Sequence, residues 1–257
     1  MPLSPTERFS RRAPYYHPSR PRYPRALVDL LVAEIGLTPS SLIADIGAGT
    51  GISAEPFLDY GCTVYAVEPN AAMRAIAQAE YGARSNLHLL DTSAEATGLP
   101  DHQMDLVMAG QAFHWFDHTA ARIEFDRIRK TDGHICLFWN TRQEKGNDGG
   151  FLAGYNALVA RYDQDGGENR MRGTATDESQ QLTTFFGAGG FQARELPNTQ
   201  TMNWEGFRAR LLSASYLPLP DDPGYEPMMN EAQSLFHQHQ VDGNVSLHYV
   251  TEVYWNR

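Results

Sequence analysis

The sequence predicts an α/β fold with a mostly parallel sheet, and three observations lead to this prediction. Short apolar runs with strand character alternate with helical segments between residues 26 and 140. A cluster of glycines at positions 47, 49 and 51 directly follows the first of these runs. A last run with alternating polarity occupies residues 245–255. Strands that alternate with helices form right-handed βαβ units, whose strands are parallel.

The first elements have clear boundaries. Residues 26–35 place Leu27, Leu31 and Ile35 on one helical face, and Gly36 ends the pattern as a C-terminal glycine would. Residues 42–46 are a short apolar run that enters the glycine cluster, which predicts a buried strand followed by a tight turn. A brief helix is expected at 53–60 and a second strand at 62–67. Asn70 is suited to cap a helix over 71–81.

The same alternation continues to about residue 140 and then changes. Strands are expected at 87–90, 106–109 and 134–139, with a helix at 118–129. Glycine- and aspartate-rich stretches at 146–150 and 163–173 indicate loops around a helix at 151–162. Later elements are a strand at 191–196, helices at 203–214 and 225–240, and a final strand at 247–255.

Length and composition favour one domain over residues 1–257. A 257-residue chain with 42% hydrophobic residues can bury a large core, and no stretch resembles a long linker. We expect an N-terminal arm or lid at 1–24, a cofactor-binding core at 25–140, and cap helices with the last strands at 141–257. Two cysteines in apolar runs, Cys62 and Cys136, predict buried thiols in a reducing compartment, so a cytoplasmic location is expected. No apolar stretch is long enough for a signal peptide or a membrane span.

The charge argues against a general nucleic-acid surface. The formal net charge is −10, whereas phosphate backbones attract clustered Lys and Arg. The first 25 residues are an exception, with six arginines, several tyrosines and several prolines. Such a segment is suited to RNA, but a structural or lid arm is the favoured interpretation.

The glycine cluster and a later acid together predict a nucleotide cofactor. Alternating glycines also occur in ordinary strand-to-helix turns, so the cluster alone is a weak signal. A dinucleotide fold favours a small residue at position 52, where this chain has Ile52, which weakens an NAD interpretation. Glu68 ends the second predicted strand, 17 residues after Gly51, where a carboxylate is placed to accept both hydroxyls of a ribose. A solvated surface acid is the alternative for Glu68.

At this point the sequence resembles the class I methyltransferases that use S-adenosylmethionine. The resembling segments are Ala44 to Gly51, Val67-Glu68-Pro69-Asn70, Ser93-Ala94-Glu95 with Leu99-Pro100, and Met104 to Val107. The segment from Gln111 to Asp117 is similar to the branch that includes trans-aconitate methyltransferases and many uncharacterised bacterial proteins. The resemblance covers about residues 40–140. It implies a Rossmann-like sheet of seven strands with an antiparallel last strand, helices on both faces and a helical cap.

The resemblance also implies a role for individual residues toward S-adenosylmethionine. The backbone of Gly47, Ala48, Gly49 and Gly51 would pass beneath the methionine and ribose, and Asp45 would support the turn and the amino group. Glu68, followed by Pro69, would hold the ribose. Ser93 and Ala94 would lie against the adenine, with Asp91 as a candidate carboxylate for its edge. Gln111 would face the methionine end.

The acceptor side is less defined. Methyl transfer from a sulfonium needs alignment and exclusion of water more than a dedicated catalytic group. A carboxylate acceptor is already ionised and would be oriented by arginines, whereas a hydroxyl or an amine needs a base, for which His114 is the candidate. A buried structural histidine is the alternative for His114, and we expect no metal site. The substrate or lid candidates are Tyr15, Tyr16, Arg20, Tyr23, Trp115, Phe116 and Arg142.

Three functions therefore remain under consideration. The first is S-adenosylmethionine-dependent methylation of a small molecule, with a carboxylate oxygen as one candidate acceptor atom. The second is an NAD-dependent oxidoreductase. The third is an RNA-acting or non-catalytic relative with the same fold. The acceptor and the oligomeric state do not follow from the sequence.

Overall fold

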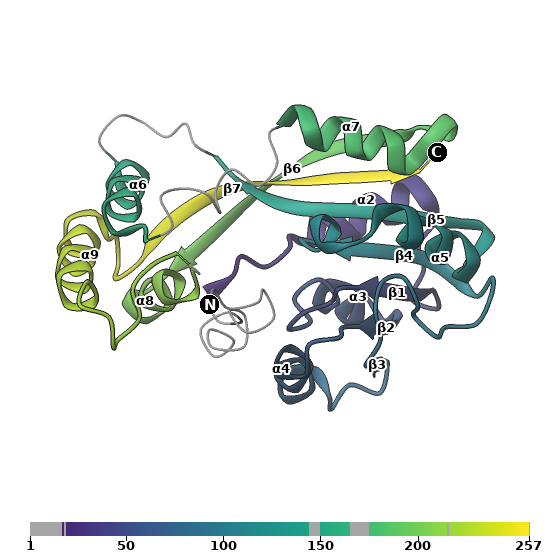
Figure 1. Ribbon diagram of the computed structural model, residues 1–257, viewed down its shortest axis with the longest axis horizontal. Helices are drawn as coiled ribbons and strands as arrows, with labels where there is room; N and C mark the ends of the chain where they lie inside the picture. Colours follow the sequence, from purple (N-terminus) through teal and green to yellow (C-terminus); the bar gives the residue numbers. More distant parts are fainter. Residues whose placement is uncertain (1–16, 18, 144–149, 165–174, 215, 257) are drawn as a thin grey trace. The chain divides into compact units, whose positions relative to one another are not determined.

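The computed structural model describes residues 17, 19–143, 150–164, 175–214 and 216–256, which contain a seven-stranded sheet with helices around it (Figure 1). The strand order is β3-β2-β1-β4-β5-β7-β6, and the sheet is mostly parallel with antiparallel last strands. This arrangement confirms the predicted fold class. The strands are β1 (Leu42–Ile46), β2 (Thr63–Val67), β3 (Leu87–Leu90), β4 (Met104–Gly110), β5 (Arg129–Arg142), β6 (Phe191–Met202) and β7 (Val245–Asn256).

The chain divides into two compact units. Unit 1 comprises the described residues within Met1–Pro21, Arg142–Thr176 and Thr199–Tyr249. Unit 2 comprises Arg22–Thr141, Asp177–Asn198 and Val250–Arg257. Residues 25–140, the expected cofactor-binding core, lie in unit 2, together with residues 177–198 and 250–256 from the region of expected cap helices and last strands.

β1 lies between β2 and β4 in the parallel part of the sheet. It pairs in parallel with β2, where Asp45 is opposite Ala66, and with β4, where Asp45 is opposite Met108. Every β1 residue after Leu42 is fully buried. A strand that is buried on both faces needs an apolar run, and this is the pattern that predicted it. Because β1 and β2 are adjacent and parallel, their carboxyl ends lie at the same edge of the sheet.

The helices of unit 2 cover both faces of its sheet. Ile43 packs in one apolar cluster with α2 (Arg25–Ile35) and α3 (Glu55–Tyr60). The neighbouring Ala44 packs in a second cluster with α5 (His118–Ile128) and α7 (Ala175–Phe186). Successive strand residues point to opposite faces, so the two clusters lie on opposite sides of the sheet. The expected helices on both faces are confirmed.

Local signals set several helix ends as predicted. Gly36 ends α2 in the left-handed conformation, with φ of 69°. Asn70 caps α4 (Ala71–Tyr81), and its side chain accepts hydrogen bonds from the amides of Ala72 and Met73. Asp117 caps α5 in the same way. These caps satisfy amides that would otherwise have no partner in the first turn of the helix.

Three elements differ from the sequence prediction. β6 has 12 residues instead of the predicted six, because the strand continues through residues 197–202. α7 was not predicted, although Leu182, Phe185 and Phe186 are buried at the spacing of one helical face. The loop-like composition before residue 174 concealed this short pattern. β5 is 14 residues long instead of the predicted six, because polar residues 129–133 and 140–142 extend the strand at both ends. Their polarity hid the extension.

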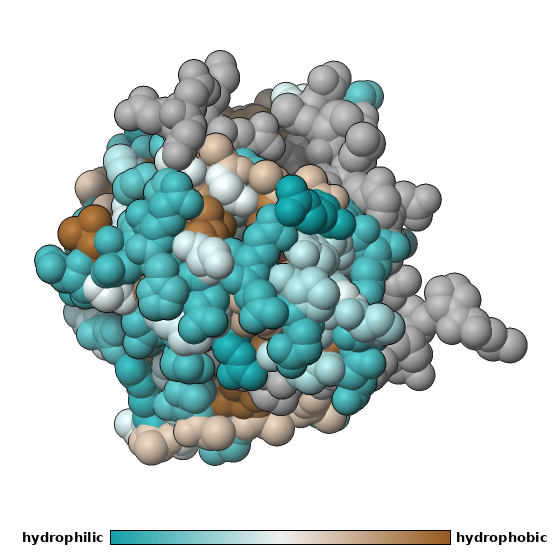
Figure 2. Space-filling model, turned by 90° about the vertical axis from the view of Figure 1, so that its left-hand side faces the viewer, coloured by the Kyte–Doolittle hydropathy of each residue, from teal (hydrophilic) through white to brown (hydrophobic). Residues whose placement is uncertain are grey.

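Unit 1 has its own apolar cluster. It joins α6 (Phe151–Tyr162), α8 (Trp204–Ser213) and α9 (Tyr225–His239). Its interior members include Tyr155, Phe207 and Met228, each at most 1% exposed. The face of these helices in Figure 2 is mostly hydrophilic, with small and separate apolar areas. These helices therefore turn their apolar sides inward, as amphipathic helices of a globular unit do.

Both cysteines are buried, as predicted. Cys62 and Cys136 are free thiols with no solvent exposure, and burial raises the pKa of Cys62 to about 11. Neither thiol is therefore prepared for nucleophilic chemistry. Within the described ranges, no helix combines the length and apolar character needed to cross a bilayer.

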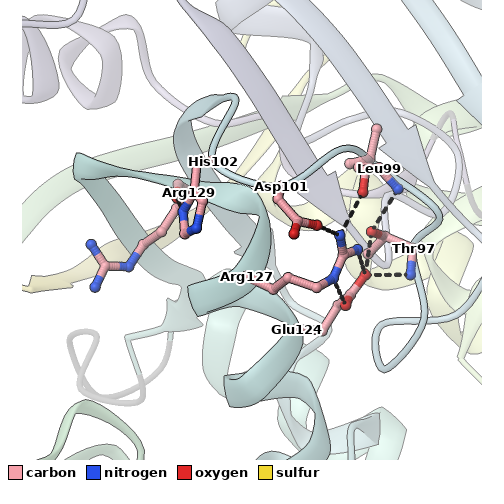
Figure 3. A network of polar contacts seen from close by, with 7 residues as sticks. All are labelled: Thr97, Leu99, Asp101, His102, Glu124, Arg127 and Arg129. Atoms are coloured by element: carbon pink, nitrogen blue, oxygen red, sulfur yellow. Dashed lines mark hydrogen bonds and ion pairs between the residues drawn. The ribbon is translucent and has the colours of Figure 1, made fainter.

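A buried ion-pair network fixes the segment between β3 and β4 (Figure 3). Glu124 on α5 accepts hydrogen bonds from the backbone amide of Thr97 at 2.8 Å and from its hydroxyl at 2.5 Å. Arg127 binds both oxygens of Glu124, at 2.6 and 2.7 Å, and also binds the carbonyl of Leu99 and the carboxylate of Asp101. The Arg127 hydrogen bond is the main reason that the pKa of Glu124 falls to about 2. The network holds this segment against α5.

We predict that Glu124→Gln lowers the free energy of unfolding by about 2 kcal/mol at pH 7, because a charged acceptor of four hydrogen bonds is lost. The lowered pKa gives stability that is present above about pH 4.5 and is lost as pH falls toward about 2. The wild-type advantage should therefore shrink over that interval in urea titrations. Asp101→Asn is the matched control, since Asp101 pairs with the same arginine but its side chain is 66% exposed. Equal losses in the two variants would contradict this account.

Candidate functional site

The turn after β1 is tied to the end of β2 through the backbone. The amides of Gly47 and Ala48 both donate to the carbonyl of Val67, at 2.8 and 3.1 Å. Gly47, Gly49 and Gly51 all have positive φ, of 69°, 57° and 84°. Residues with a side chain rarely adopt positive φ, so the alternating glycines permit the bend.

The three glycines face different surroundings. A Cβ on Gly47 would lie 2.6 Å from the Cβ of Ala112 and 3.3 Å from the ring of Phe116. A Cβ on Gly51 would lie 2.8 Å from the ring of Tyr81. A Cβ on Gly49 would meet nothing within 4 Å. Gly47 and Gly51 are therefore needed for packing, whereas Gly49 leaves open space in which a ligand can approach the backbone.

Glu68 lies directly against this turn. Its Oε2 accepts the amide of Gly49 at 2.8 Å, and its Oε1 accepts the amide of Asn70 at 2.8 Å. Only 9% of Glu68 is exposed, and this burial raises the pKa of its carboxyl, while the two amide bonds and Arg74 lower it. Each carboxylate oxygen can accept a second hydrogen bond, so the group can still bind hydroxyls. The sequence prediction did not include the two backbone amides.

Asp45 is a fully buried acid with one unsatisfied oxygen. The hydroxyl of Ser53 donates to its Oδ2 at 2.6 Å, whereas its Oδ1 has no hydrogen-bond partner among the described residues. Burial is the largest cause that raises the pKa of Asp45 to about 7; the Ser53 hydrogen bond opposes it, and the charge of Glu68 adds to it. A buried acceptor without a partner is costly, so Oδ1 is suited to a donor supplied from outside the protein.

The segment expected at the adenine begins with an ion pair. Arg74 binds Asp91 at 2.6 Å and also donates to the carbonyl of Glu68 at 2.6 Å. Asp91 is largely exposed and Ser93 is half-buried, while Ala94 is 6% exposed. Arg74 therefore joins the ends of β2 and β3, a contact that sequence reasoning missed. Pro69 is exposed beside Glu68.

Gln111, at the end of β4, has a strained backbone. Its φ is 57°, which is uncommon for a residue with a side chain. Its amide donates to the carbonyl of Phe138 at 3.0 Å, and its side-chain Oε1 accepts the amide of Asn140 at 2.7 Å. These contacts hold the exposed Gln111 at the sheet edge. Its predicted contact with a methionine group stays a prediction.

The aromatic segment after Gln111 forms a short 3-10 helix, Phe113–Trp115. His114 is exposed, with its ring 4.9 Å from that of Trp115, which is 45% exposed. The structural alternative of a buried histidine is therefore wrong. Phe116 is half-buried and packs beside Gly47. This packing gives Phe116 a structural role at the turn.

The structure describes some of the lid candidates and places them in different units. Tyr15 and Tyr16 lie outside the described residues. Tyr23 belongs to unit 2, where it is 8% exposed and its ring meets Phe138 edge to face at 4.7 Å. Arg20 and Arg142 belong to unit 1. The lid role stays a prediction.

A metal site has little support from the histidines. His118 lies on α5, its Nε2 bonds to the carbonyl of Phe113 at 3.1 Å, and its ring stacks on Phe113. His114 lies outside that helix. Among the described residues, no group of three His, Cys, Asp or Glu side chains is arranged to hold an ion.

Comparisons with known proteins agree with this geometry. Residues 44–137 match a family model described as a methyltransferase domain. An uncharacterized methyltransferase-like protein of Schizosaccharomyces pombe is 32% identical over 130 residues, which are 50% of each chain. An uncharacterized methyltransferase of Mycobacterium bovis is 34% identical over 51% of each chain. The malonyl-[acyl-carrier protein] O-methyltransferase of Enterobacter lignolyticus is 31% identical over 42% of each chain. The chain thus spans about half the length of the curated relatives that it matches.

Solved structures extend the likeness in fold over nearly the whole chain. A structure from Anaeromyxobacter dehalogenans, described as a proposed type II methyltransferase, covers 93% of this chain and 97% of its own. Its TM-score is 0.62 at 21% identity. At this identity the likeness shows the fold alone. The sheet, including its antiparallel last strands, is therefore that of solved proteins described as methyltransferases.

We predict that Gly47→Ala destabilises the protein by about 2–4 kcal/mol, from left-handed backbone strain and from overpacking against Ala112. Gly98→Ala is the control, since Gly98 has φ of 71° but no atom within 4 Å of its added Cβ. Denaturant titrations should therefore show a loss of only about 1 kcal/mol for Gly98→Ala. Similar losses at the two positions would show that packing at the turn is unimportant.

We predict that Asp45→Asn changes the pH dependence of stability. Because the pKa of Asp45 rises from 3.8 to about 7 on folding, the native state keeps a proton that the unfolded state loses, so stability falls between these pH values. Asp45→Asn should remove this decline, which is on the order of 4 kcal/mol across the interval. Thermal unfolding from pH 4 to pH 8 measures the difference. Asp29→Asn, at a side chain that is 63% exposed, should leave the decline in place; parallel profiles for wild type and Asp45→Asn would refute the prediction.

Proposed function

We propose that the chain transfers a methyl group from S-adenosylmethionine to a small-molecule acceptor, with a carboxylate oxygen as the candidate acceptor atom. The observation that carries this proposal is the arrangement at the turn after β1. Gly49 leaves open space there, Glu68 bonds to its amide, and Asp45 has a buried oxygen without a partner. Together they place two acids, whose ionised forms a bound cation would favour, at a backbone that a ligand can approach.

The charges of this site suit a cationic cofactor. S-adenosylmethionine carries a sulfonium and an ammonium, whereas NAD carries an anionic pyrophosphate. Two acids whose charges interact, Asp45 and Glu68, attract the first and repel the second. Ile52 also argues against NAD, because a dinucleotide fold favours a small residue at this position.

The residues present fit the cofactor position by position. Asp45 would accept from the ammonium with its free Oδ1, and Glu68 would accept the ribose hydroxyls with the lone pairs that the amides leave. Ser93 and Ala94 would line the adenine side. Gln111 would border the methionine end. The bound cofactor supplies an activated methyl group.

The protein's part in the transfer is alignment and exclusion of water. A carboxylate acceptor enters the reaction already ionised, so no base is required. A hydroxyl or amine acceptor would lose its proton to His114, whose exposed ring is accessible to a substrate. Trp115, also partly exposed, would cover the acceptor.

The comparisons support methyl transfer and leave the acceptor to this proposal. Several relatives are named methyltransferases, and one of them is named an O-methyltransferase, which favours an oxygen acceptor. The net charge of −10 favours a small molecule over nucleic acid. The buried free thiols fit the reducing, cytoplasmic compartment that we assume. The resemblance to the trans-aconitate branch stays a prediction.

Calorimetry on the full chain tests the cofactor. We expect S-adenosylmethionine to bind and NAD not to bind. Glu68→Gln should weaken binding at least tenfold, because an amide accepts ribose hydroxyls with one oxygen instead of two. Glu34→Gln, an exposed acid on α2, should leave the affinity unchanged.

The outcomes of this experiment are distinct. Binding of NAD without S-adenosylmethionine would overturn the proposal. Binding of S-adenosylmethionine followed by methyl transfer to bulk RNA, in a labelled-methyl assay, would replace the small-molecule acceptor with RNA. Transfer to a carboxylic acid in a metabolite panel is the expected result.

A further inference from the structure

Unit 1 contains a cluster of arginines and tyrosines that the proposed cofactor site does not use. We call it the arginine–tyrosine cluster. Its members come from the segment before α2, the end of β5, α6, α8, the loop after α8, and β7. They are Arg20, Arg142, Tyr155, Arg210, Tyr216 and Tyr249.

Arg142 is held in place by an aromatic ring and an amide. Its guanidinium carbon lies 4.9 Å from the ring centroid of Tyr155, which is 1% exposed. Its Nη2 donates to the Oδ1 of Asn156 at 2.9 Å. Its Nε is buried and has no hydrogen-bond partner among the described residues. Arg142 is therefore fixed, and part of its donor set is unused.

Arg210 is in a similar position on α8. It lies one turn after Phe207, whose ring is 6.1 Å from that of Tyr155. Its Nε is also buried, and the described part of the chain offers it no hydrogen-bond partner. Burial would lower the pKa of Arg210, but Tyr155, Tyr249 and Tyr216 outweigh this effect and raise it. The group is therefore a permanent cation among aromatic side chains.

Hydrogen bonds link Tyr249 to the segment that carries Arg20. The hydroxyl of Tyr249 donates to the Oε1 of Gln200 at 3.3 Å, and the Nε2 of Gln200 donates to the carbonyl of Ser19 at 2.8 Å. Ser19 precedes Arg20 in the chain. The charges of all three arginines lower the pKa values of Tyr216 and Tyr249 against the larger effect of burial. The six side chains therefore share one electrostatic environment.

Several acids of unit 1 have other partners. In unit 1, Glu231 pairs with Arg161, Glu205 pairs with Arg208, and Asp222 accepts the amide of Leu219. No carboxylate of the described residues forms an ion pair with Arg142 or Arg210. Arg142 and Arg210 are partly buried, with buried Nε atoms, so these cations lack the acid that would usually accompany them in a chain of net charge −10.

We propose that the arginine–tyrosine cluster binds the carboxylate of a small organic acid. Guanidinium groups bind carboxylates through two parallel hydrogen bonds. The half-buried ring of Tyr216 suits a planar group with an apolar body better than the tetrahedral oxygens of phosphate. Binding itself is independent of methyl transfer, whereas the identification of this acid as the methyl acceptor rests on the proposed function.

Calorimetry on the full chain with matched ligand pairs tests the proposal. The probes are benzoate with benzamide, succinate with succinamide, and inorganic phosphate, all at equal ionic strength. We expect at least one carboxylate to bind tenfold more tightly than its amide and more tightly than phosphate. Arg142→Gln and Arg210→Gln should each weaken that binding at least tenfold. Arg161→Gln is the matched control, since Arg161 is an exposed arginine of the same unit that already pairs with an acid.

Each outcome decides between the alternatives. Equal binding of acids and amides, stronger binding of phosphate, or an unchanged affinity in Arg142→Gln would overturn the proposal. If Arg210→Gln does not fold by circular dichroism, Arg210→Lys keeps the charge and tests the geometry, and it should also weaken binding. Parallel titration with S-adenosylmethionine separates the two proposals. Arg142→Gln should bind the cofactor as tightly as the wild type does. If the wild type binds a carboxylate but not S-adenosylmethionine, the proposed function fails and the carboxylate site stands.

Discussion

The contact between the β1 turn and the end of β2 is the constraint on which the candidate site depends. Two consecutive amides share the carbonyl of Val67, and the amide of Gly49 reaches the carboxylate of Glu68. These bonds require positive φ at the glycines, and they require Ala112 and Phe116 to be close enough to exclude a side chain at Gly47. The turn, the acid and the segment after β4 are therefore one packed assembly.

Periodicity and glycine placement were sufficient to predict most of unit 2. Apolar runs identified β1 and β2 because strands buried on both faces must be apolar, and Gly36 and Asn70 marked helix ends because those positions have specific backbone needs. Periodicity failed to predict the full length of β5, where polar residues extend the strand. It also missed α7, where a short row of buried apolar residues follows a loop-like segment. In both cases a tertiary contact, and not local preference, determines the structure.

The candidate site, too, could be predicted from the sequence only in part. The proximity of Glu68 to the glycine turn followed from strand order, since adjacent parallel strands end at the same edge. The contacts of Arg74 with Glu68 and Asp91, and the unsatisfied oxygen of Asp45, did not, because they depend on side-chain directions across three strands. The arginine–tyrosine cluster could not be predicted from the sequence. Its members are spread over more than 200 residues, and only Arg20 and Arg142 had positions that suggested a role.

Unit 2 is assembled from three separate stretches of chain, and the segment that resembles known families is only one of them. β7 supplies Asn256 to the amide of Ile135 and Glu252 to the indole of Trp139, both on β5, while α7 supplies Phe185 to the apolar cluster beneath α5. A truncation after residue 141 would leave an open sheet edge and an uncovered hydrophobic face, which are the features that drive aggregation. The boundaries of sequence similarity are therefore unsuitable as boundaries for expression, and a fragment that contains all of unit 2 has to include residues 177–198 and 250–256.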